Sequence, residues 1–243
     1  MARPGSGDRA AGDIVRTEIL PDPGAVAIRA AERIAQVARN AVAERGRCAL
    51  GFSGGTTPWR TFRALAEEDV PWERVHLFQV DERIAPPGDP ERNDFHLKEV
   101  LIDRIAIPSA NVHSMPVEEE DLDEGGRRYE AILRQVAGTP PVLDLVQLGL
   151  GEDGHTASLF PDDAALRIVD ADVAVSGLYK GRRRMTLTFP AIDRARGILW
   201  LVTGSGKSEA LGRLRAGDRS IPAGRVRSDL AVLLADKAAE GIG

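Results

Sequence analysis

Cysteine and long apolar runs are the features that this sequence lacks most clearly. Cys48 is the single cysteine among 243 residues, which excludes an intramolecular disulfide and any metal site built from several thiolates. No stretch is apolar over the roughly 20 residues that a membrane-spanning helix needs, and the first residues lack the apolar centre of a signal peptide. We therefore expect a protein of a reducing compartment and place it in the cytoplasm.

A surplus of basic side chains is also missing. The 32 Lys and Arg residues are outnumbered by 37 Asp and Glu residues, which gives a net charge of −5. Nucleic-acid-binding proteins usually carry a basic surplus or stripe, whereas a small anionic substrate needs only a local basic pocket. We therefore expect a small-molecule partner, no nucleic acid and no membrane, and a monomer or small homo-oligomer.

Two kinds of apolar pattern alternate along the chain, and they predict strands and helices in turn. We predict a disordered tail over residues 1–13 and a single α/β domain over residues 14–243. The predicted fold is a Rossmann-like three-layer α/β/α sandwich with a mainly parallel sheet. The predicted strands are Ile14–Leu20, Cys48–Phe52, Val75–Val80, Val142–Leu148, Met185–Phe189, Ile198–Val202 and Leu230–Leu234. The predicted helices are Ala25–Arg45, Pro58–Glu67, Asp94–Arg104, Glu119–Val136 and Gly206–Ala216.

Ligands of open parallel sheets bind at the carboxyl ends of the strands, so the turns after the strands are candidate sites. The first such turn reads Ser-Gly-Gly-Thr-Thr-Pro and follows Phe52. Its glycines let backbone N–H groups converge, its hydroxyls add donors, and the next helix contributes its positive N-terminal end. We predict a phosphate cradle here, and the alternative is an ordinary strand–helix turn. The residues of the cradle are Ser53, Gly54, Gly55, Thr56 and Thr57.

Charged residues follow two further predicted strands. Asp81-Glu82-Arg83 comes directly after Val80, and it can orient a sugar and neutralise an oxyanion or form a solvated charge cluster. The glycine-rich turn after Leu148 contains Asp153 and His155. A neutral imidazole can take a proton from water near neutral pH, and the aspartate can orient the ring or raise its basicity. We predict His155 as the general base.

The turn after Val202 supplies a lysine, and an arginine run precedes another predicted strand. Lys207 stands at the start of a helix after glycines, which suits a second phosphate contact. Arg182, Arg183 and Arg184 precede Met185, and they can supply another contact, although we expect at least one of the three to be solvated.

Two partial motifs point elsewhere. The glycines of Gly149-x-Gly151-x-x-Gly154 match the dinucleotide fingerprint, but Pro161 cuts the helix that this fingerprint needs to about two turns. Gly206-Lys207-Ser208 resembles the end of a Walker A loop, but Leu201 stands where the first glycine of that motif is required. We therefore expect neither a nicotinamide enzyme nor an NTPase.

Taken together, these segments resemble the 6-phosphogluconolactonase family and, more distantly, glucosamine-6-phosphate deaminase, over about residues 14–237. The most specific element is residues 149–161, which read Gly-Leu-Gly-Glu-Asp-Gly-His-Thr-Ala-Ser-Leu-Phe-Pro. The deaminases share its Gly-Asp-Gly-His-type part but continue differently, and they carry tyrosine at the position of Arg83. Both differences favour the lactonases. The chain departs from the family at Asn93-Asp94-Phe95, where Ser-Asn-aromatic is common.

The resemblance implies a hydrolase that opens 6-phosphogluconolactone with water and needs no metal or organic cofactor. It matches the catalytic positions of the family to His155, Asp153, Asp81 and Arg83. It matches the phosphate contacts of the family to the Ser53–Thr56 turn, Arg184 and Lys207. The alternatives are an aldose–ketose isomerase or deaminase that uses Asp81 as base, and a sugar-phosphate sensor without turnover.

Overall fold

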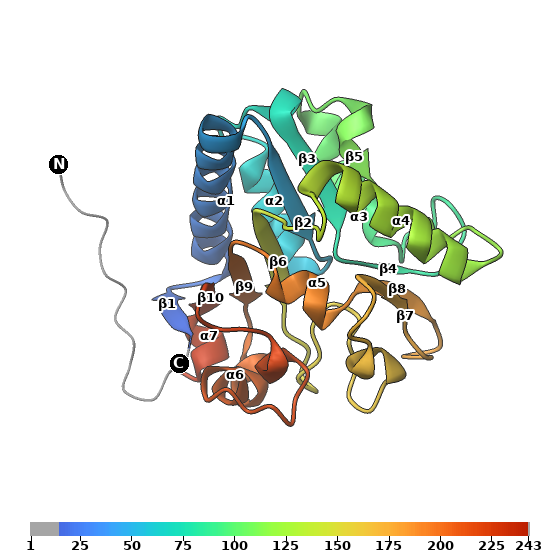
Figure 1. Ribbon diagram of the computed structural model, residues 1–243. Helices are drawn as coiled ribbons and strands as arrows, with labels where there is room; N and C mark the ends of the chain where they lie inside the picture. The colour runs from blue at the N-terminus through green and yellow to red at the C-terminus, as the bar shows by residue number, and fades with distance from the viewer. Residues whose placement is uncertain (1–14, 243) are drawn as a thin grey trace.

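The structure is a computed structural model that describes residues 15–242, so the predicted disordered tail of residues 1–13 lies outside the described residues. A parallel sheet runs through the middle, in the strand order β1-β10-β9-β6-β2-β3-β5 (Figure 1). All its neighbouring strands pair in parallel. Its strands are β1 (Arg16–Leu20), β2 (Cys48–Phe52), β3 (Val75–Gln79), β5 (Val112–His113), β6 (Leu145–Gly149), β9 (Ile198–Val202) and β10 (Ala231–Asp236).

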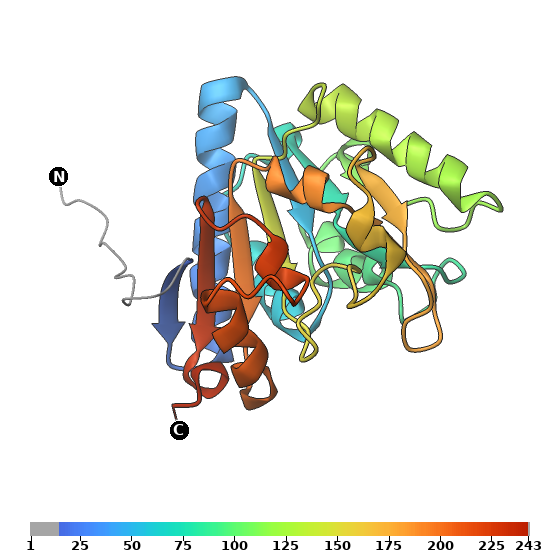
Figure 2. The same ribbon diagram turned by 60° about the horizontal axis from the view of Figure 1, so that its bottom comes forward.

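Helices cover both faces of this sheet and enclose two hydrophobic cores, which confirms the predicted three-layer fold (Figures 1 and 2). The helices on the first face are α1 (Pro23–Arg45), α2 (Thr56–Leu65) and α3 (Asn93–Val100). Those on the second face are α4 (Leu122–Ala137), α5 (Phe189–Asp193), α6 (Ser208–Arg215) and α7 (Lys237–Glu240).

Local sequence explains the bounds of the longest helix. The side chain of Asp22 accepts a hydrogen bond from the backbone N–H of Ala25 at 2.9 Å, and Pro23 occupies the first turn, where its missing N–H costs nothing. Gly46 ends α1 in the left-handed conformation with φ 75°, which glycine adopts without a steric penalty. The helix buries small and branched residues such as Ala30 and Ile34 against the sheet.

A second, smaller sheet was missed by the sequence analysis. It contains β4 (Asp81–Arg83), β8 (Arg184–Leu187) and β7 (Val173–Val175), and its pairs are antiparallel. The predicted strand Met185–Phe189 therefore belongs to this sheet, and it ends at Leu187 because α5 begins at Phe189. An apolar run does not reveal whether a strand pairs in parallel or antiparallel, so the pattern alone could not separate the two sheets.

Several predicted helices have different bounds in the structure. The predicted Asp94–Arg104 helix ends at Val100 and is followed by a separate 3-10 turn, Ile102–Arg104. The predicted Gly206–Ala216 helix begins with the 3-10 turn Ser205–Lys207 before α6 starts. No helix follows Gly154, where the chain forms successive turns instead.

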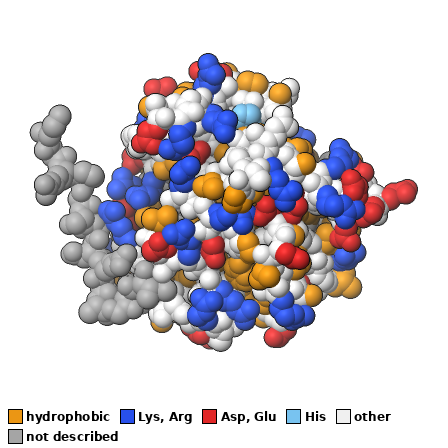
Figure 3. Space-filling view, viewed as in Figure 1, with side chains coloured by type: hydrophobic (Ala, Val, Ile, Leu, Met, Phe, Trp, Pro, Cys, Tyr) orange, Lys and Arg blue, Asp and Glu red, His pale blue; other side chains and the backbone are white. Residues whose placement is uncertain are grey.

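On the face drawn in Figure 3, basic and acidic side chains are interspersed and do not form one continuous basic stripe. Among the helices of residues 15–242, none combines the length and the apolar character that a membrane crossing requires.

Candidate functional site

A cleft of about 420 Å³ opens at the carboxyl ends of β2, β6 and β9, beside β4 of the small sheet. Turns that are far apart in the sequence meet there, as expected for an open parallel sheet. Every predicted site residue except Asp153 lines this cleft, and Asp153 contacts one that does. The lining residues predicted from sequence are Ser53, Gly54, Gly55, Thr56, Thr57, Asp81, Arg83, His155, Arg184 and Lys207.

The predicted phosphate cradle lies at the N-terminus of α2. The N-cap residue is Gly55, and no side chain caps the helix there, so the first N–H groups of α2 are available to an anion. Gly54 packs so closely on Asn93 that a Cβ at position 54 would lie 1.9 Å from the Asn93 Oδ1. The hydroxyls of Thr57 and Thr203 are 2.6 Å apart, which joins the cradle to the turn after β9.

His155 is held by the carboxylate two residues before it. The His155 Nδ1 and the Asp153 Oδ1 are 2.5 Å apart. A neutral imidazole that donates from Nδ1 to a carboxylate leaves Nε2 with a free lone pair. Gly151 allows this arrangement, because a Cβ there would lie 2.1 Å from the His155 Nδ1. The ring is therefore oriented as a base requires.

The electrostatic surroundings keep this imidazole neutral near neutral pH. Burial lowers the pKa of His155 below its ordinary value, and the nearby Arg184 acts in the same direction. The carboxylates of Asp153 and Asp81 oppose this shift without cancelling it. Partial burial opposes ionisation of Asp153, but hydrogen bonds from His155 and Tyr179 outweigh it, so the pKa of Asp153 lies below its usual range.

Two aromatic residues lie beside this histidine: Phe160, which belongs to the 149–161 motif but was given no role, and Tyr179, which sequence reasoning missed. The hydroxyl of Tyr179 donates a hydrogen bond to the Asp153 Oδ2 at 3.0 Å. The Tyr179 ring stacks on Phe160, with centroids 3.8 Å apart and planes 7° from parallel. The Tyr179 and His155 rings meet in an edge-type contact, with centroids 5.3 Å apart and planes at 61°. Tyr179 lies in the hairpin loop between β7 and β8, and no motif marks it in the sequence, so only the fold brings it to the site.

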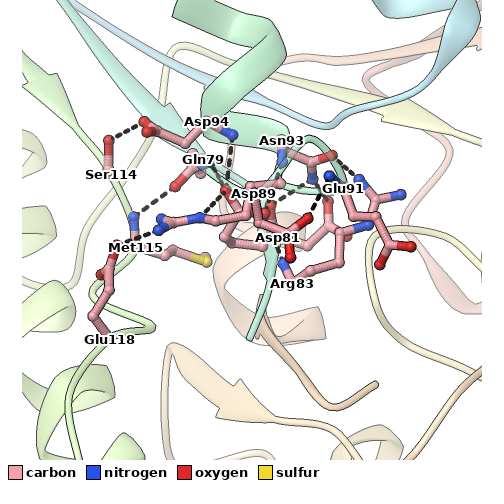
Figure 4. A network of polar contacts seen from close by, with 12 residues as sticks. Gln79, Asp81, Arg83, Asp89, Glu91, Asn93, Asp94, Ser114, Met115 and Glu118 are labelled. Atoms are coloured by element: carbon pink, nitrogen blue, oxygen red, sulfur yellow. Dashed lines mark hydrogen bonds and ion pairs between the residues drawn. The ribbon is translucent and has the colours of Figure 1, made fainter. Parts of the chain in front are cut away.

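The three residues of the Asp81-Glu82-Arg83 turn do not all face the cleft. Asp81 and Arg83 line the cleft, whereas Glu82 points into the protein and is fully buried. The hydroxyl of Ser158 donates to the Asp81 Oδ2 at 2.6 Å. Asn93 connects the two cleft residues, since its amide donates to the Asp81 carbonyl and its oxygen accepts from Arg83 (Figure 4). Glu82 therefore has a structural role, not the sugar contact that the turn suggested.

The three arginines of the run have different surroundings. Arg184 lines the cleft, and its guanidinium lies over the Phe160 ring at 5.3 Å. Burial lowers the pKa of Arg184, and the neighbouring Arg83 adds to this effect, yet a guanidinium stays charged. Arg183 is exposed, as expected for at least one of the three. Arg182 forms ion pairs with Asp89 and Glu91.

Lys207 lies in the cleft, whereas His76 and His113 lie outside it. Lys207 is half-buried in the cleft, and its Nζ lies 3.9 Å from the Glu152 Oε1. His76 and His113 pair with each other, with Nδ1 and Nε2 at 3.1 Å. Over residues 15–242, no group of three or more His, Cys, Asp or Glu side chains is arranged to hold a metal ion.

Comparisons with known proteins agree with the resemblance seen in the motifs. The family model for glucosamine-6-phosphate isomerases/6-phosphogluconolactonase matches residues 21–234. A Synechocystis protein named 6-phosphogluconolactonase is 43% identical over 180 residues, which cover 72% of this chain and 75% of that protein. A Mycobacterium leprae protein of the same name is 35% identical over 238 residues, covering 91% and 96%. The crystal structure of 6-phosphogluconolactonase from Thermotoga maritima superposes with a TM-score of 0.80 at 29% identity, covering 90% of this chain and 98% of that one. This chain therefore belongs to the glucosamine-6-phosphate isomerase/6-phosphogluconolactonase family.

Proposed function

We propose that this chain is a 6-phosphogluconolactonase, which hydrolyses the lactone of 6-phosphogluconate to the free acid. The observation that carries the proposal is the single cleft that holds both the imidazole of His155 and the anion cradle at the N-terminus of α2. A volume of about 420 Å³ suits a phosphorylated sugar. The relatives named 6-phosphogluconolactonase support the same substrate.

The phosphate of the substrate binds first in this mechanism. The free N–H groups at the start of α2, together with Arg184 and Lys207, hold it in the cradle. Binding energy at the phosphate then positions the lactone carbonyl near His155, although the phosphate takes no part in the bond changes.

Chemistry begins with His155 as general base. Its Nε2 takes a proton from a water molecule, and the resulting hydroxide adds to the carbonyl carbon of the lactone. Asp153 accepts a hydrogen bond from the His155 Nδ1–H and stabilises the imidazolium that forms. Arg83 lies in the cleft wall and neutralises the oxyanion.

The second half of the reaction returns the proton. The tetrahedral intermediate collapses, the bond from the carbonyl carbon to the ring oxygen breaks, and the imidazolium gives its proton to that oxygen. The sum is one lactone plus one water giving one hydroxy acid. A sugar lactone is an activated ester, so one base and good positioning suffice without a covalent intermediate.

A coupled assay tests the function. The lactone is generated in place from glucose 6-phosphate by an excess of its dehydrogenase, and the acid formed is measured with 6-phosphogluconate dehydrogenase. We expect the chain to raise the rate well above that of spontaneous hydrolysis. Incubation with glucosamine 6-phosphate, followed by an ammonia assay, covers the deaminase alternative. Release of ammonia without lactone hydrolysis would overturn the proposal.

The rate should depend on pH through His155. Only the neutral imidazole is a base, so kcat/KM rises with pH and then reaches a plateau. Because burial lowers the pKa of His155, we expect the half-maximal rate below the ordinary imidazole value of about 6.5. A profile from roughly pH 5 to 8, corrected for spontaneous hydrolysis, measures this. A rate that stays flat across this range in folded protein would remove the histidine from the mechanism.

Tyr179→Phe should lower kcat by about tenfold and leave KM nearly unchanged. The variant keeps the ring stacked on Phe160 but removes the hydrogen bond to Asp153, and hydrogen bonds to charged groups typically contribute about 1.5–3 kcal/mol. Asp153 then holds His155 less firmly. Steady-state kinetics beside thermal unfolding checks the result. An unchanged kcat would mean that the other contacts of Asp153 are sufficient.

A further inference from the structure

A second cavity of about 410 Å³ adjoins the cleft and has no part in the proposed reaction. We call it the side chamber. It shares Gly55, Thr56, Arg83 and Arg184 with the cleft. The two cavities therefore meet at a common wall, formed by the N-terminus of α2 and by two guanidinium groups.

This common wall carries two guanidinium groups, and the Asp81 carboxylate, which also lines the cleft, favours the charged form of Arg184. Arg83 and Arg184 are register partners in the β4–β8 pair, so the two arginines stand side by side. Within residues 15–242, neither guanidinium forms an ion pair, and the buried Nε of Arg184 has no hydrogen-bond partner. The uncapped first turn of α2 adds further donors. An anion that bridges the two cavities therefore contacts Arg83, Arg184 and the N–H groups of the first turn of α2.

The outer part of the side chamber adds a cation and an aromatic wall. Lys180 is exposed, and in the described part of the chain its ammonium has no carboxylate within ion-pair distance. Its backbone is held in the left-handed conformation, with φ 48°, beside the bridge between Tyr179 and Arg182. On another side, the rings of Trp59 and His96 lie 5.4 Å apart.

Arg182 is less available than Lys180 to bind an anion. Arg182 lines the side chamber, but it is paired with Asp89 and Glu91. Glu91 is also the only carboxylate that lines the chamber among the described residues. Lys180 is therefore an exposed cation of the side chamber that, among the described residues, is not paired with a carboxylate.

We propose that the cleft and the side chamber together bind a diphosphate group, with one phosphate in the cradle and the second in the side chamber. Because the two cavities share four lining residues, both phosphates of one diphosphate can contact the same two guanidinium groups. The second phosphate meets Lys180, Arg83 and Arg184, which suits its charge. The diphosphate has two possible sources, inorganic pyrophosphate or a nucleoside diphosphate whose base lies against Trp59.

Direct binding of phosphate and pyrophosphate, measured by calorimetry without substrate, tests the proposal. We expect pyrophosphate to bind the wild-type chain at least tenfold more tightly than phosphate. In Lys180→Gln this ratio should fall severalfold, because the second phosphate loses its free cation. Lys237→Gln removes another exposed lysine, which does not line the side chamber, and should leave the ratio unchanged. Equal affinities in the wild-type chain, or a ratio that Lys180→Gln does not alter, would overturn the proposal.

A second set of titrations distinguishes the two sources. If a nucleoside diphosphate is the ligand, ADP binds more tightly than both AMP and pyrophosphate, and Trp59→Leu removes the advantage over pyrophosphate. If inorganic pyrophosphate is the ligand, ADP binds no more tightly than pyrophosphate. Either result supports the diphosphate site, whereas binding of both compounds no tighter than phosphate contradicts it.

Competition connects the site to the cleft. Because the first phosphate uses the cradle, pyrophosphate should be displaced by 6-phosphogluconate, the monophosphate product of the proposed reaction. The proposal rests on the cradle but not on turnover. A chain without lactonase activity that still prefers pyrophosphate would contradict the proposed function alone. An active lactonase with no such preference would contradict the side-chamber site alone.

Discussion

His155→Gln is expected to lower kcat by about 10²–10⁴-fold, which is the usual contribution of a general base. Glutamine keeps much of the size and polarity of the side chain but cannot accept a proton from water at Nε2. The phosphate contacts lie in the cradle, on other elements of the fold. KM should therefore change only a few-fold, and the loss should appear almost entirely in kcat. Steady-state assays with freshly generated lactone measure both constants.

His76→Gln is the matched control for this substitution. His76 lies in β3 and pairs with His113, outside the cleft. We expect that variant to keep wild-type kcat, with at most a modest loss of thermal stability. The prediction is contradicted if His155→Gln turns over at the wild-type rate, or if it loses activity only because it fails to fold. Circular dichroism of both variants separates these outcomes.

The main sheet and its turns were predictable because their signals are local. Cys48–Phe52 and Ile198–Val202 are continuous apolar runs, and the structure gives both strands the predicted bounds. Parallel strands place their carboxyl ends on one edge of the sheet, so turns that hold Ser53 and His155 had to converge if the fold was right. The predicted fold was therefore a stronger reason to expect a single cleft than any one motif was.

The small sheet and its consequences were not predictable in the same way. Three-residue strands such as Asp81–Arg83 carry too little pattern to be recognised. Without that sheet, nothing in the sequence indicates that Arg83 stands beside Arg184, or that the loop after β7 brings Tyr179 to Asp153. Glu82 is a further example, because a charged residue beside two functional residues gives no sign that it is buried.

Glu82 is the centre of a buried hydrogen-bond network beside the cleft. Figure 4 shows the neighbours Gln79, Asn93 and Asp94 that take part in this network. Its Oε1 accepts from the backbone N–H groups of Arg83 and Asn93, at 2.7 and 2.8 Å. Its Oε2 accepts from the Gln79 amide and the Asp94 N–H, both at 2.8 Å. The Arg92 Nε lies 3.6 Å from the same oxygen. One carboxylate therefore fixes the end of β3, the end of β4 and the start of α3.

Glu82→Gln should reduce the free energy of unfolding by about 3–5 kcal/mol, the range for breaking a buried ion pair by removing one partner. The new amide turns an NH₂ group toward N–H donors in a site that is 0% exposed, so at least one donor loses its acceptor and meets another donor. Urea denaturation measures the loss. Glu18→Gln is the control, because Glu18 pairs with Arg29 at the surface, and exposed pairs contribute less than about 1 kcal/mol.

The same substitution links stability to activity. Glu82 holds the backbone of Arg83 and Asn93, and Asn93 in turn bonds both Arg83 and Asp81. Lactonase activity of Glu82→Gln should therefore fall even at temperatures where the variant is fully folded, since catalysis is sensitive to small displacements of positioned groups. A folded variant with both wild-type activity and wild-type stability would show that this corner of the sheet is held by its backbone pairing alone.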